Sequence, residues 1–301
     1  MTRRRRLLAA AVALGVGLVL APAAFQMFSR APSGGEMIDD FRPHMTQQRI
    51  DSFRSHLDRI GAAEAEAQAS GAGELPALAA LHTEWSGIDA DMTGMLDDIE
   101  PNIGNFEAVD ALPPFPLFPW FFVLPGLIAA GLAAWGLLRV RAGRAAGPAL
   151  TALAVLGVGL VAAPAVFQMF GRAPKGAEMI DDLRPLMTEA RVTTLQQSFL
   201  VIGAAEGELR IEVLPATAAG ELPATRAFVE RWPAMSAEMA PMIGAMADNL
   251  DNFADVDALP PFGLFPWFFV IPGVLLVGIG VAGRGRAHAP AVAAALSHEG
   301  G

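Results

Sequence analysis

The segment VDALPPFPLFPWFFVLPG, from Val109 to Gly126, occurs a second time as VDALPPFGLFPWFFVIPG, from Val256 to Gly273, with 16 of 18 positions identical. Asp110 and Asp257 end a polar stretch, and the paired prolines that follow stop any helix arriving from it. The aromatic residues after the prolines are typical of the headgroup layer of a membrane. We therefore interpret the segment as an entry from water into a bilayer, present twice. The residues predicted to form the interface belt are Phe118, Trp120, Phe121, Phe265, Trp267 and Phe268.

Composition and charge support a membrane protein. The 301 residues are 53% hydrophobic, with a mean hydropathy of +0.41, which is too apolar for an ordinary soluble domain. Cysteine is absent, which excludes disulfides, thiolate catalysis and cysteine metal sites. Of the 31 acidic residues, 30 lie in segments 29–114 and 171–261, whereas arginines cluster at 3–6, 139–144 and 284–286. This asymmetry predicts a bacterial plasma-membrane protein with both termini in the cytoplasm and both acidic segments outside.

A second repeated stretch completes a tandem repeat. Residues 14–46 match residues 156–188 at 26 of 33 positions. A cleavable signal peptide is the rival interpretation of the first apolar run, because it follows four arginines and contains small residues. The nearly identical run in mid-chain favours a retained membrane span. We predict a basic N-terminus at 1–6 and a disordered cytoplasmic tail at 284–301. The first copy, 7–142, has membrane spans at 7–28 and 115–138 on either side of an outer helical hairpin at 29–114. The second copy, 143–283, has membrane spans at 149–170 and 262–283 on either side of an outer helical hairpin at 171–261.

Each acidic segment shows the apolar spacing of two helices joined by a tip. Apolar residues recur at steps of three and four, which predicts helices packed lengthwise. We expect SRAPSGG at 29–35 to be a connection between helices, and prolines 101, 233 and 241 to kink or split the returning helices. Trp85 and Trp232 hold equivalent positions and should be buried. The predicted fold is all-α: four membrane helices and an extracytoplasmic four-helix, two-hairpin bundle, with parallel repeats related by a pseudo-twofold axis near the membrane normal.

Few residues in the sequence suggest a catalytic, metal-binding or cofactor-binding role. The methionines at 235, 239, 242 and 246 could bind Cu(I), but they occupy the apolar seam, and we interpret them as core. The histidines show no zinc-binding spacing, and we interpret them as surface residues. Glycine pairs 15/17 and 157/159 suggest close helix contacts. Gln26 and Gln168 suit hydrogen bonds between helices. We expect no cofactor, no metal, no nucleic-acid partner and no enzymatic activity.

The strongest functional candidate is a polar strip beside the membrane. EMIDDFRP (36–43) and EMIDDLRP (178–185) are nearly identical, whereas the helices beyond them have diverged: residues 47–59 retain one match in 13 and residues 77–104 retain seven in 28. Carboxylates in a first helical turn and Asp–Arg spacing of three explain part of this strip structurally. The candidate interaction site comprises Glu36, Asp39, Asp40, Arg42, Asn105, Asp110, Glu178, Asp181, Asp182, Arg184, Asn252 and Asp257.

These features favour a non-enzymatic protein whose outer bundle and acidic strip contact a protein, lipid headgroup or cation in the cell envelope. A transporter with a pore or lipid path along the pseudo-twofold axis is one alternative, and a sensor subunit that needs a cytoplasmic partner is another. The layout is loosely similar to the sensing half of bacterial chemoreceptors, in architecture only. The bilayer is the expected lipid partner, and the sequence leaves oligomerisation open.

Overall fold

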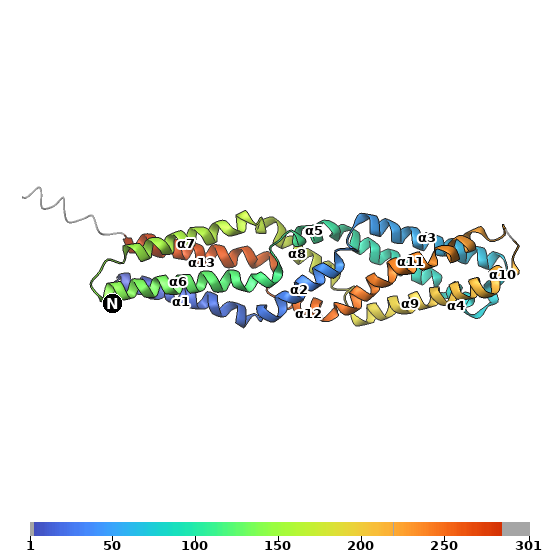
Figure 1. Ribbon diagram of the computed structural model, residues 1–301, viewed down its shortest axis with the longest axis horizontal. Helices are drawn as coiled ribbons and strands as arrows, with labels where there is room; N and C mark the ends of the chain where they lie inside the picture. The colour runs from blue at the N-terminus through green and yellow to red at the C-terminus, as the bar shows by residue number, and fades with distance from the viewer. Residues whose placement is uncertain (1–2, 219, 285–301) are drawn as a thin grey trace, which may run out of the picture. The chain divides into compact units, whose positions relative to one another are not determined.

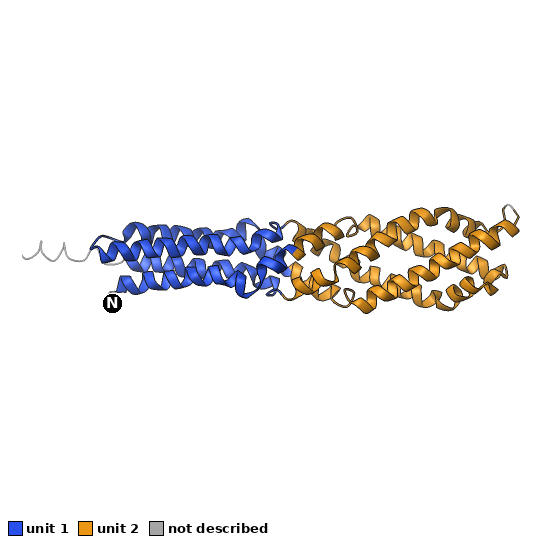
Figure 2. Cartoon of the chain, turned by 60° about the horizontal axis from the view of Figure 1, so that its bottom comes forward, with its two compact units in different colours: residues 1–32, 112–174, 259–301 blue, residues 33–111, 175–258 orange. Residues whose placement is uncertain are grey.

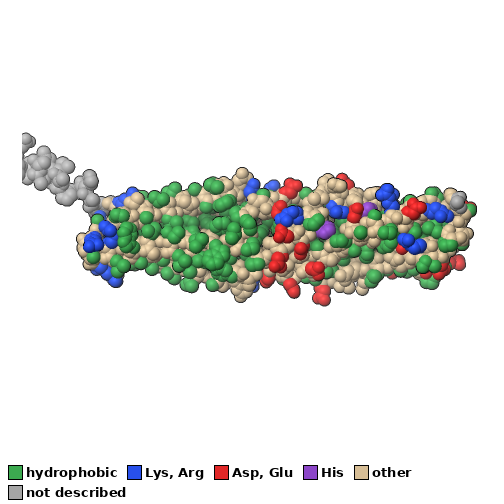
Figure 3. Space-filling model, in the orientation of Figure 1, with side chains coloured by type: hydrophobic (Ala, Val, Ile, Leu, Met, Phe, Trp, Pro, Cys, Tyr) green, Lys and Arg blue, Asp and Glu red, His purple; other side chains and the backbone are tan. Residues whose placement is uncertain are grey.

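The computed structural model describes residues 3–218 and 220–284, which are helical with no strand among them; helix accounts for 87% of the structure. Four helices are long and apolar enough to cross a membrane (Figure 1). The chain divides into two compact units (Figure 2), which we call the apolar unit (1–32, 112–174 and 259–301) and the charged unit (33–111 and 175–258). Hydrophobic side chains cover much of the visible face of the apolar unit, whereas acidic and basic side chains are scattered over that of the charged unit (Figure 3). The four long apolar helices are α1 (Arg3–Ala24), α6 (Phe118–Arg141), α7 (Gly147–Val166) and α13 (Phe265–Arg284).

Within the apolar unit, helices pair inside each sequence copy. The most extensive contacts join α1 to α6 and α7 to α13. Glycine permits this approach: a Cβ on Gly15 would lie 2.6 Å from the carbonyl oxygen of Gly126, and one on Gly157 would lie 2.5 Å from that of Gly273. The predicted close helix contacts are therefore confirmed for Gly15 and Gly157. The other glycine of each pair, Gly17 and Gly159, has no such neighbour within 4 Å.

The first and third spans end earlier than expected. Helix α1 ends at Ala24 and α7 at Val166, and α2 (Met27–Phe41) and α8 (Met169–Leu183) begin almost at once. Gln26 and Gln168 adopt left-handed backbone conformations, with φ of 53° and 55°, and their carbonyl oxygens accept the first bonds of the new helices. These glutamines therefore redirect the backbone, which the sequence interpretation missed.

The connection expected at 29–35 is wrong, because this stretch lies inside α2 despite Pro32 and two glycines. Its equivalent lies inside α8, around Pro174. Both helices bury an apolar face that includes Met37 and Met179, and this packing outweighs the local preference for a break. The predicted tail at 284–301 lies, apart from Arg284, outside the described residues.

The charged unit contains four long helices: α3 (Gln47–Ala69), α4 (Pro76–Ile99), α9 (Glu189–Glu208) and α11 (Pro223–Asp248). Helix α3 packs most extensively on α11, and α4 on α9, so the largest contacts join the two sequence copies (Figure 1). Helices α3 and α4, and α9 and α11, also contact each other. The expected seam is buried along α3, as shown by Ile50 and Ile60, which have no exposed surface.

The structure corrects one expectation for these helices and confirms another. Trp85 and Trp232 were expected to be buried, but both are only half-buried. Pro101 does split the returning helix: α4 ends at Ile99, a 3₁₀ turn spans Glu100–Asn102, and α5 (Ile103–Asp110) follows. Helix α11 instead continues through prolines 233 and 241, and it is followed by α12 (Leu250–Asp257) after a break at Asn249. At the tips, the first copy has a 3₁₀ turn at Ala72–Glu74 and the second a π-helical turn at Leu209–Val213 followed by α10 (Leu214–Ala216).

Candidate functional site

All twelve predicted site residues lie in the charged unit, and ten of them form matching contacts in the two copies. Arg42 donates to Asp110 at 2.7 Å and pairs with Asp39 at 2.7 Å. Arg184 repeats this arrangement with Asp257 at 2.6 Å and Asp181 at 2.9 Å.

The hydrogen bonds that the two arginines donate to Asp110 and Asp257, followed by those to Asp39 and Asp181, raise the pKa of both arginines. Because both guanidinium groups are solvent-exposed, these pairs contribute little stability and chiefly orient the carboxylates.

Two further carboxylates link one copy to the other. The side-chain amide of Asn249 donates to Asp40 at 2.9 Å, and that of Asn102 donates to Asp182 at 3.1 Å. The asparagines are 0% and 1% exposed. Each also receives a hydrogen bond from a predicted site residue, because Asn105 donates to Asn102 and Asn252 to Asn249. Sequence reasoning missed Asn102 and Asn249, although they are among the few identical positions within the diverged helices.

Glu36 and Glu178 differ from the other site residues. Both are exposed, and among the described residues no hydrogen bond or ion pair joins either to the rest of the chain. They lie on α2 and α8 at equivalent positions, 142 residues apart. Of the predicted strip, these two carboxylates have no internal role that accounts for their identity.

A second kind of reciprocal link, an ion pair, joins the copies farther along the long helices. Arg49, the only match within 47–59, pairs with Glu238 at 2.9 Å, and its equivalent Arg191 pairs with Asp91, the equivalent of Glu238. Each pair joins an outward helix of one copy to the returning helix of the other. The arginine that is identical in both copies therefore has an ion-pair partner that the sequence did not reveal.

A third kind of reciprocal link joins a glutamate of one copy to the N-terminus of the returning helix, α4 or α11, of the other copy. Glu66 accepts a hydrogen bond from the backbone N–H of Thr225 at 2.7 Å. Its equivalent Glu208 accepts from the N–H groups of Ala77 and Leu78, each at 2.9 Å. Free N–H groups and the helix dipole make a helix N-terminus a favourable place for a carboxylate. A side chain of one copy thus caps a helix of the other.

Ser52, His56 and Glu238 form a polar cluster whose geometry does not suit nucleophilic catalysis. Ser52 donates to Glu238 at 2.8 Å, and Nε2 of His56 lies 3.3 Å from the same carboxylate oxygen. In a catalytic triad the acid contacts the imidazole nitrogen remote from the serine. Here Nδ1 of His56 is buried without a partner. The hydrogen bond from Ser52 is the largest cause of a lowered pKa of Glu238; burial opposes it, and the hydrogen bond and charge of His56 and the charge of Arg49 lower the pKa further.

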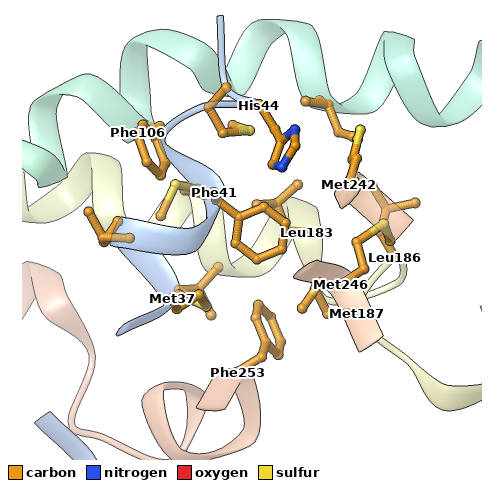
Figure 4. A pocket seen from close by; sticks show the side chains of 15 residues that line it. Met37, Phe41, His44, Phe106, Leu183, Leu186, Met187, Met242, Met246 and Phe253 are labelled. Atoms are coloured by element: carbon orange, nitrogen blue, oxygen red, sulfur yellow. The ribbon is translucent and has the colours of Figure 1, made fainter. Parts of the chain in front are cut away.

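A cavity of about 40 Å³ lies in the charged unit among α2, α4, α5, α8, α11 and α12 (Figure 4). Its walls are apolar apart from His44, which was interpreted as a surface residue but is only 8% exposed. Burial, followed by the charge of Arg49, lowers the pKa of His44, so its ring is neutral at pH 7. Among the described residues, no cluster of three or more histidine, aspartate or glutamate side chains is arranged to hold a metal ion.

The predicted belt residues lie in the apolar unit and fall into three groups by exposure. Trp120 and Trp267 are 48% and 50% exposed and stack edge-on against Phe28 and Phe170. Phe118 and Phe265 are instead buried, with ring centroids 5.6 Å apart. The remaining predicted belt residues, Phe121 and Phe268, are half-buried.

Comparison with known proteins does not assign the chain to a family. No family model matches the chain, and no curated protein is significantly similar to it.

Proposed function

We propose that the chain is a non-enzymatic plasma-membrane protein whose charged unit lies outside the cytoplasm and contacts another envelope component through an acidic, membrane-proximal strip. One observation supports this most directly. Glu36 and Glu178 are identical in both copies and exposed, yet neither has an internal contact among the described residues. Packing and ion pairing account for most of the other identical polar residues, whereas these two suggest an external contact.

The proposed architecture is a tandem repeat with a pseudo-twofold axis near the membrane normal, four membrane helices and an outer four-helix bundle. Three sets of reciprocal links support it: asparagine to aspartate, arginine to carboxylate, and glutamate to helix N-terminus. In each of these three sets, the link made by the first copy to the second has a counterpart made in the opposite direction. Such reciprocity is what a twofold relation between the copies produces.

A basic surface on a partner protein fits the exposed carboxylates best among the classes considered. Glu36 and Asp39 lie one turn apart on α2, and Glu178 and Asp181 repeat this on α8. The described residues contain no three-acid cluster suited to a metal ion, which favours a protein over a bare cation. Electrostatic complementarity with a basic patch would give specificity and rapid association. A lipid headgroup with a cationic moiety is the second candidate.

Transport and sensing remain alternative functions. A path along the proposed axis would meet phenylalanines of α6 and α13: the rings of Phe118 and Phe265 are 5.6 Å apart, and those of Phe122 and Phe269 are 5.0 Å apart. A pore would require these buried rings to separate, which favours the non-transport proposal. A sensor subunit that acts through a separate cytoplasmic partner is the second alternative.

Topology can be tested with single cysteines, because the chain has none of its own. Ser70→Cys and Thr217→Cys, in the tips, should react with a membrane-impermeant thiol reagent on intact spheroplasts. Ala145→Cys, between the second and third spans, should react only after permeabilisation. Labelling of Ala145→Cys from outside would overturn the proposed orientation.

The strip can be tested by placing a photo-crosslinking amino acid at Glu36 or Glu178 and, for comparison, at Ser70 or Thr217. We expect the strip positions to give a discrete adduct in living cells and the tip positions to give none. With the crosslinking amino acid placed at Asp39 instead, the double variant Glu36→Gln with Glu178→Gln should give a weaker adduct. The substitutions remove two negative charges that we propose attract the partner. The matched control is Glu84→Gln with Glu230→Gln, two exposed acids on α4 and α11. Adducts formed from the tips alone would place the contact there instead.

A further inference from the structure

One end of the apolar unit carries eight arginines, whereas the described part of that unit contains no acidic residue. Packing contacts bring four helix termini together at this end. A Cβ on Gly136 of α6 would lie 2.9 Å from Leu8 of α1 and 3.1 Å from Ala149 of α7. One on Gly283 of α13 would lie 2.7 Å from Leu150 of α7. Figure 3 shows basic side chains gathered there. We call this region the arginine end, and its arginines are Arg3, Arg4, Arg5, Arg6, Arg139, Arg141, Arg144 and Arg284.

The arginines of α1 are placed against the electrostatics of their own helix. Residues 3–6 form its first turn, where the helix dipole already puts partial positive charge. Arg139, Arg141 and Arg284 instead lie in the last turns of α6 and α13, where the dipole favours a cation. No acidic side chain among the described residues pairs with any of the eight arginines. Helix α1 by itself therefore does not account for its four charges, and an anion beside them would offset their repulsion.

Two of these arginines are held in place by backbone carbonyl groups. Nε of Arg4 donates to the carbonyl oxygen of Gly283 at 3.1 Å, which joins α1 to α13. Nε of Arg139 donates to that of Ala145 at 2.7 Å, and its guanidinium lies 5.2 Å from the ring centroid of Trp135. Among the described residues, the Nη groups of both arginines have no partner. A guanidinium fixed in this way presents N–H donors that match phosphate oxygens. Membrane orientation requires positive charge alone, so it accounts for the sign of these residues and not for their placement.

An exposed apolar surface on α6 leads directly to the arginine end. Trp135 and Leu138 are exposed within its last turns, and Leu124 and Leu127 are exposed closer to its start. A phospholipid carries a phosphate next to hydrocarbon chains, so it would cover this apolar surface and meet the guanidinium groups together. A soluble anion or an acidic protein segment would leave the apolar surface uncovered. The surroundings of the arginines therefore favour a lipid as the source of the anion.

We propose that the arginine end binds anionic phospholipid, with the Nη groups of Arg4 and Arg139 donating hydrogen bonds to phosphate oxygens and acyl chains lying on the exposed face of α6. Basic residues between membrane helices suit anionic headgroups. A headgroup without a cationic moiety fits best, because choline or ethanolamine would bring a positive charge close to eight arginines. Binding requires only that the apolar helices lie in a bilayer. It involves neither the acidic strip nor the side of the membrane on which the charged unit lies.

The test uses the full-length chain purified in detergent, with phosphatidylglycerol as the probe and phosphatidylcholine of the same acyl chains as the comparison. Native mass spectrometry counts the bound lipids and gives their affinities, and inorganic phosphate and glycerol phosphate are added as soluble competitors. The double variant Arg4→Lys with Arg139→Lys keeps both charges but removes the Nε bonds and the planar guanidinium groups. The matched control is Arg6→Lys with Arg141→Lys, two exposed arginines on the same helices. Melting temperatures without lipid report whether each variant folds.

We expect phosphatidylglycerol to bind saturably and more tightly than phosphatidylcholine. Arg4→Lys with Arg139→Lys should weaken that binding by about tenfold, as the loss of charge-assisted hydrogen bonds does. The control pair should bind like the unmodified chain, and the soluble competitors should not displace the lipid. Equal affinity of the unmodified chain for the two lipids would overturn the proposal, as would full affinity in the Arg4 and Arg139 variant. Equal loss in both double variants would reduce the interaction to net charge, and displacement by inorganic phosphate would assign the arginines to a soluble anion; either result also overturns it.

Discussion

The two units of this protein pack their helices by different rules. In the apolar unit, α1 lies against α6 and α7 against α13, so each sequence copy pairs mainly with itself. In the charged unit, α3 lies against α11 and α4 against α9, so the largest contacts cross from one copy to the other. Backbone approach at glycine characterises the first unit, and reciprocal polar links characterise the second.

This difference explains which residues remained alike in the two copies. Where backbones touch, almost no substitution of glycine fits, and Gly15 and Gly126 have glycine equivalents. Where amphipathic helices pack, many apolar side chains fill the space, and identities have drifted. Within those drifted helices, retained residues such as Arg49, Glu66 and Asn102 make the links between copies.

The largest effect should come from filling a glycine contact in the apolar unit. Gly15→Val or Gly157→Val would place side-chain atoms against the carbonyl oxygen of a neighbouring helix, where the backbone must move. Overpacking of this kind costs about 1–3 kcal/mol and sometimes more. Thermal unfolding in detergent should show a clear drop in melting temperature for each.

Gly17→Val and Gly159→Val are matched controls, because a Cβ at either position has no neighbour within 4 Å. They lie two residues farther along the same helices. If all four variants melt alike, close backbone approach does not hold these pairs together, and the contrast between the units fails.

Removing a tryptophan should have the next largest effect, and it should differ between copies. Trp232 packs against Phe199 and Phe228, with ring centroids 5.4 Å and 5.6 Å away. Trp85 instead lies over Gly61. Because Trp232 is half-buried, Trp232→Ala should cost about 2 kcal/mol, less than a fully buried aromatic. Trp85→Ala should cost less, and equal losses measured by chemical unfolding would contradict this ranking.

The buried asparagines offer a direct test of the links between copies. Asn249→Ala removes donors to Asp40 and to the carbonyl oxygen of Ala245, which should cost about 1–2 kcal/mol. A double-mutant cycle with Asp40→Ala should show coupling. The same cycle with Asp39→Ala, one residue away and paired with Arg42, should show none. Coupling to both or to neither would mean that the link contributes no specific stability.

The sequence predicted the helical content and the four apolar helices, because long uncharged runs and heptad spacing are strong local signals. It missed the turn at Gln26, since left-handed glutamine is uncommon and has no sequence signature. It also placed a connection where α2 continues, because the breaker residues there are overruled by burial of one face. These are effects of tertiary packing, which a local pattern does not contain.

The sequence predicted most residues of the candidate site but few of the contacts between them. Agreement between the copies identified Asp39, Arg42 and Asp110, and their spacing correctly suggested the Asp39–Arg42 pair. Asn102 and Asn249 were missed because the helix around each has diverged. The apolar cavity could not be predicted either, since its walls meet only once α2, α8 and α11 are packed together.

The smallest effect concerns the ion pairs that cross between copies, and pH provides the test. The pKa of Glu238 lies below its ordinary value of 4.5, chiefly because Ser52 donates to it and then because of His56 and Arg49. A carboxylate with a lowered pKa in the folded state stabilises the protein above its ordinary pKa. That contribution disappears as the pH falls from about 5 through the lowered value. Since this side chain is 37% exposed, the contribution should be at most about 1 kcal/mol.

Glu238→Gln should therefore unfold more easily than the unmodified chain at pH 7, and the difference should shrink as the pH is lowered below 4.5. Subtracting the two unfolding free energies at each pH removes the titration of the other carboxylates, which both chains share. Glu230→Gln, an exposed acid on the same helix, is the control and should leave a small difference that does not vary with pH. A Glu238→Gln difference that persists unchanged at low pH would mean that the hydrogen bonds of Glu238, and not its charge, stabilise this contact between α11 and α3.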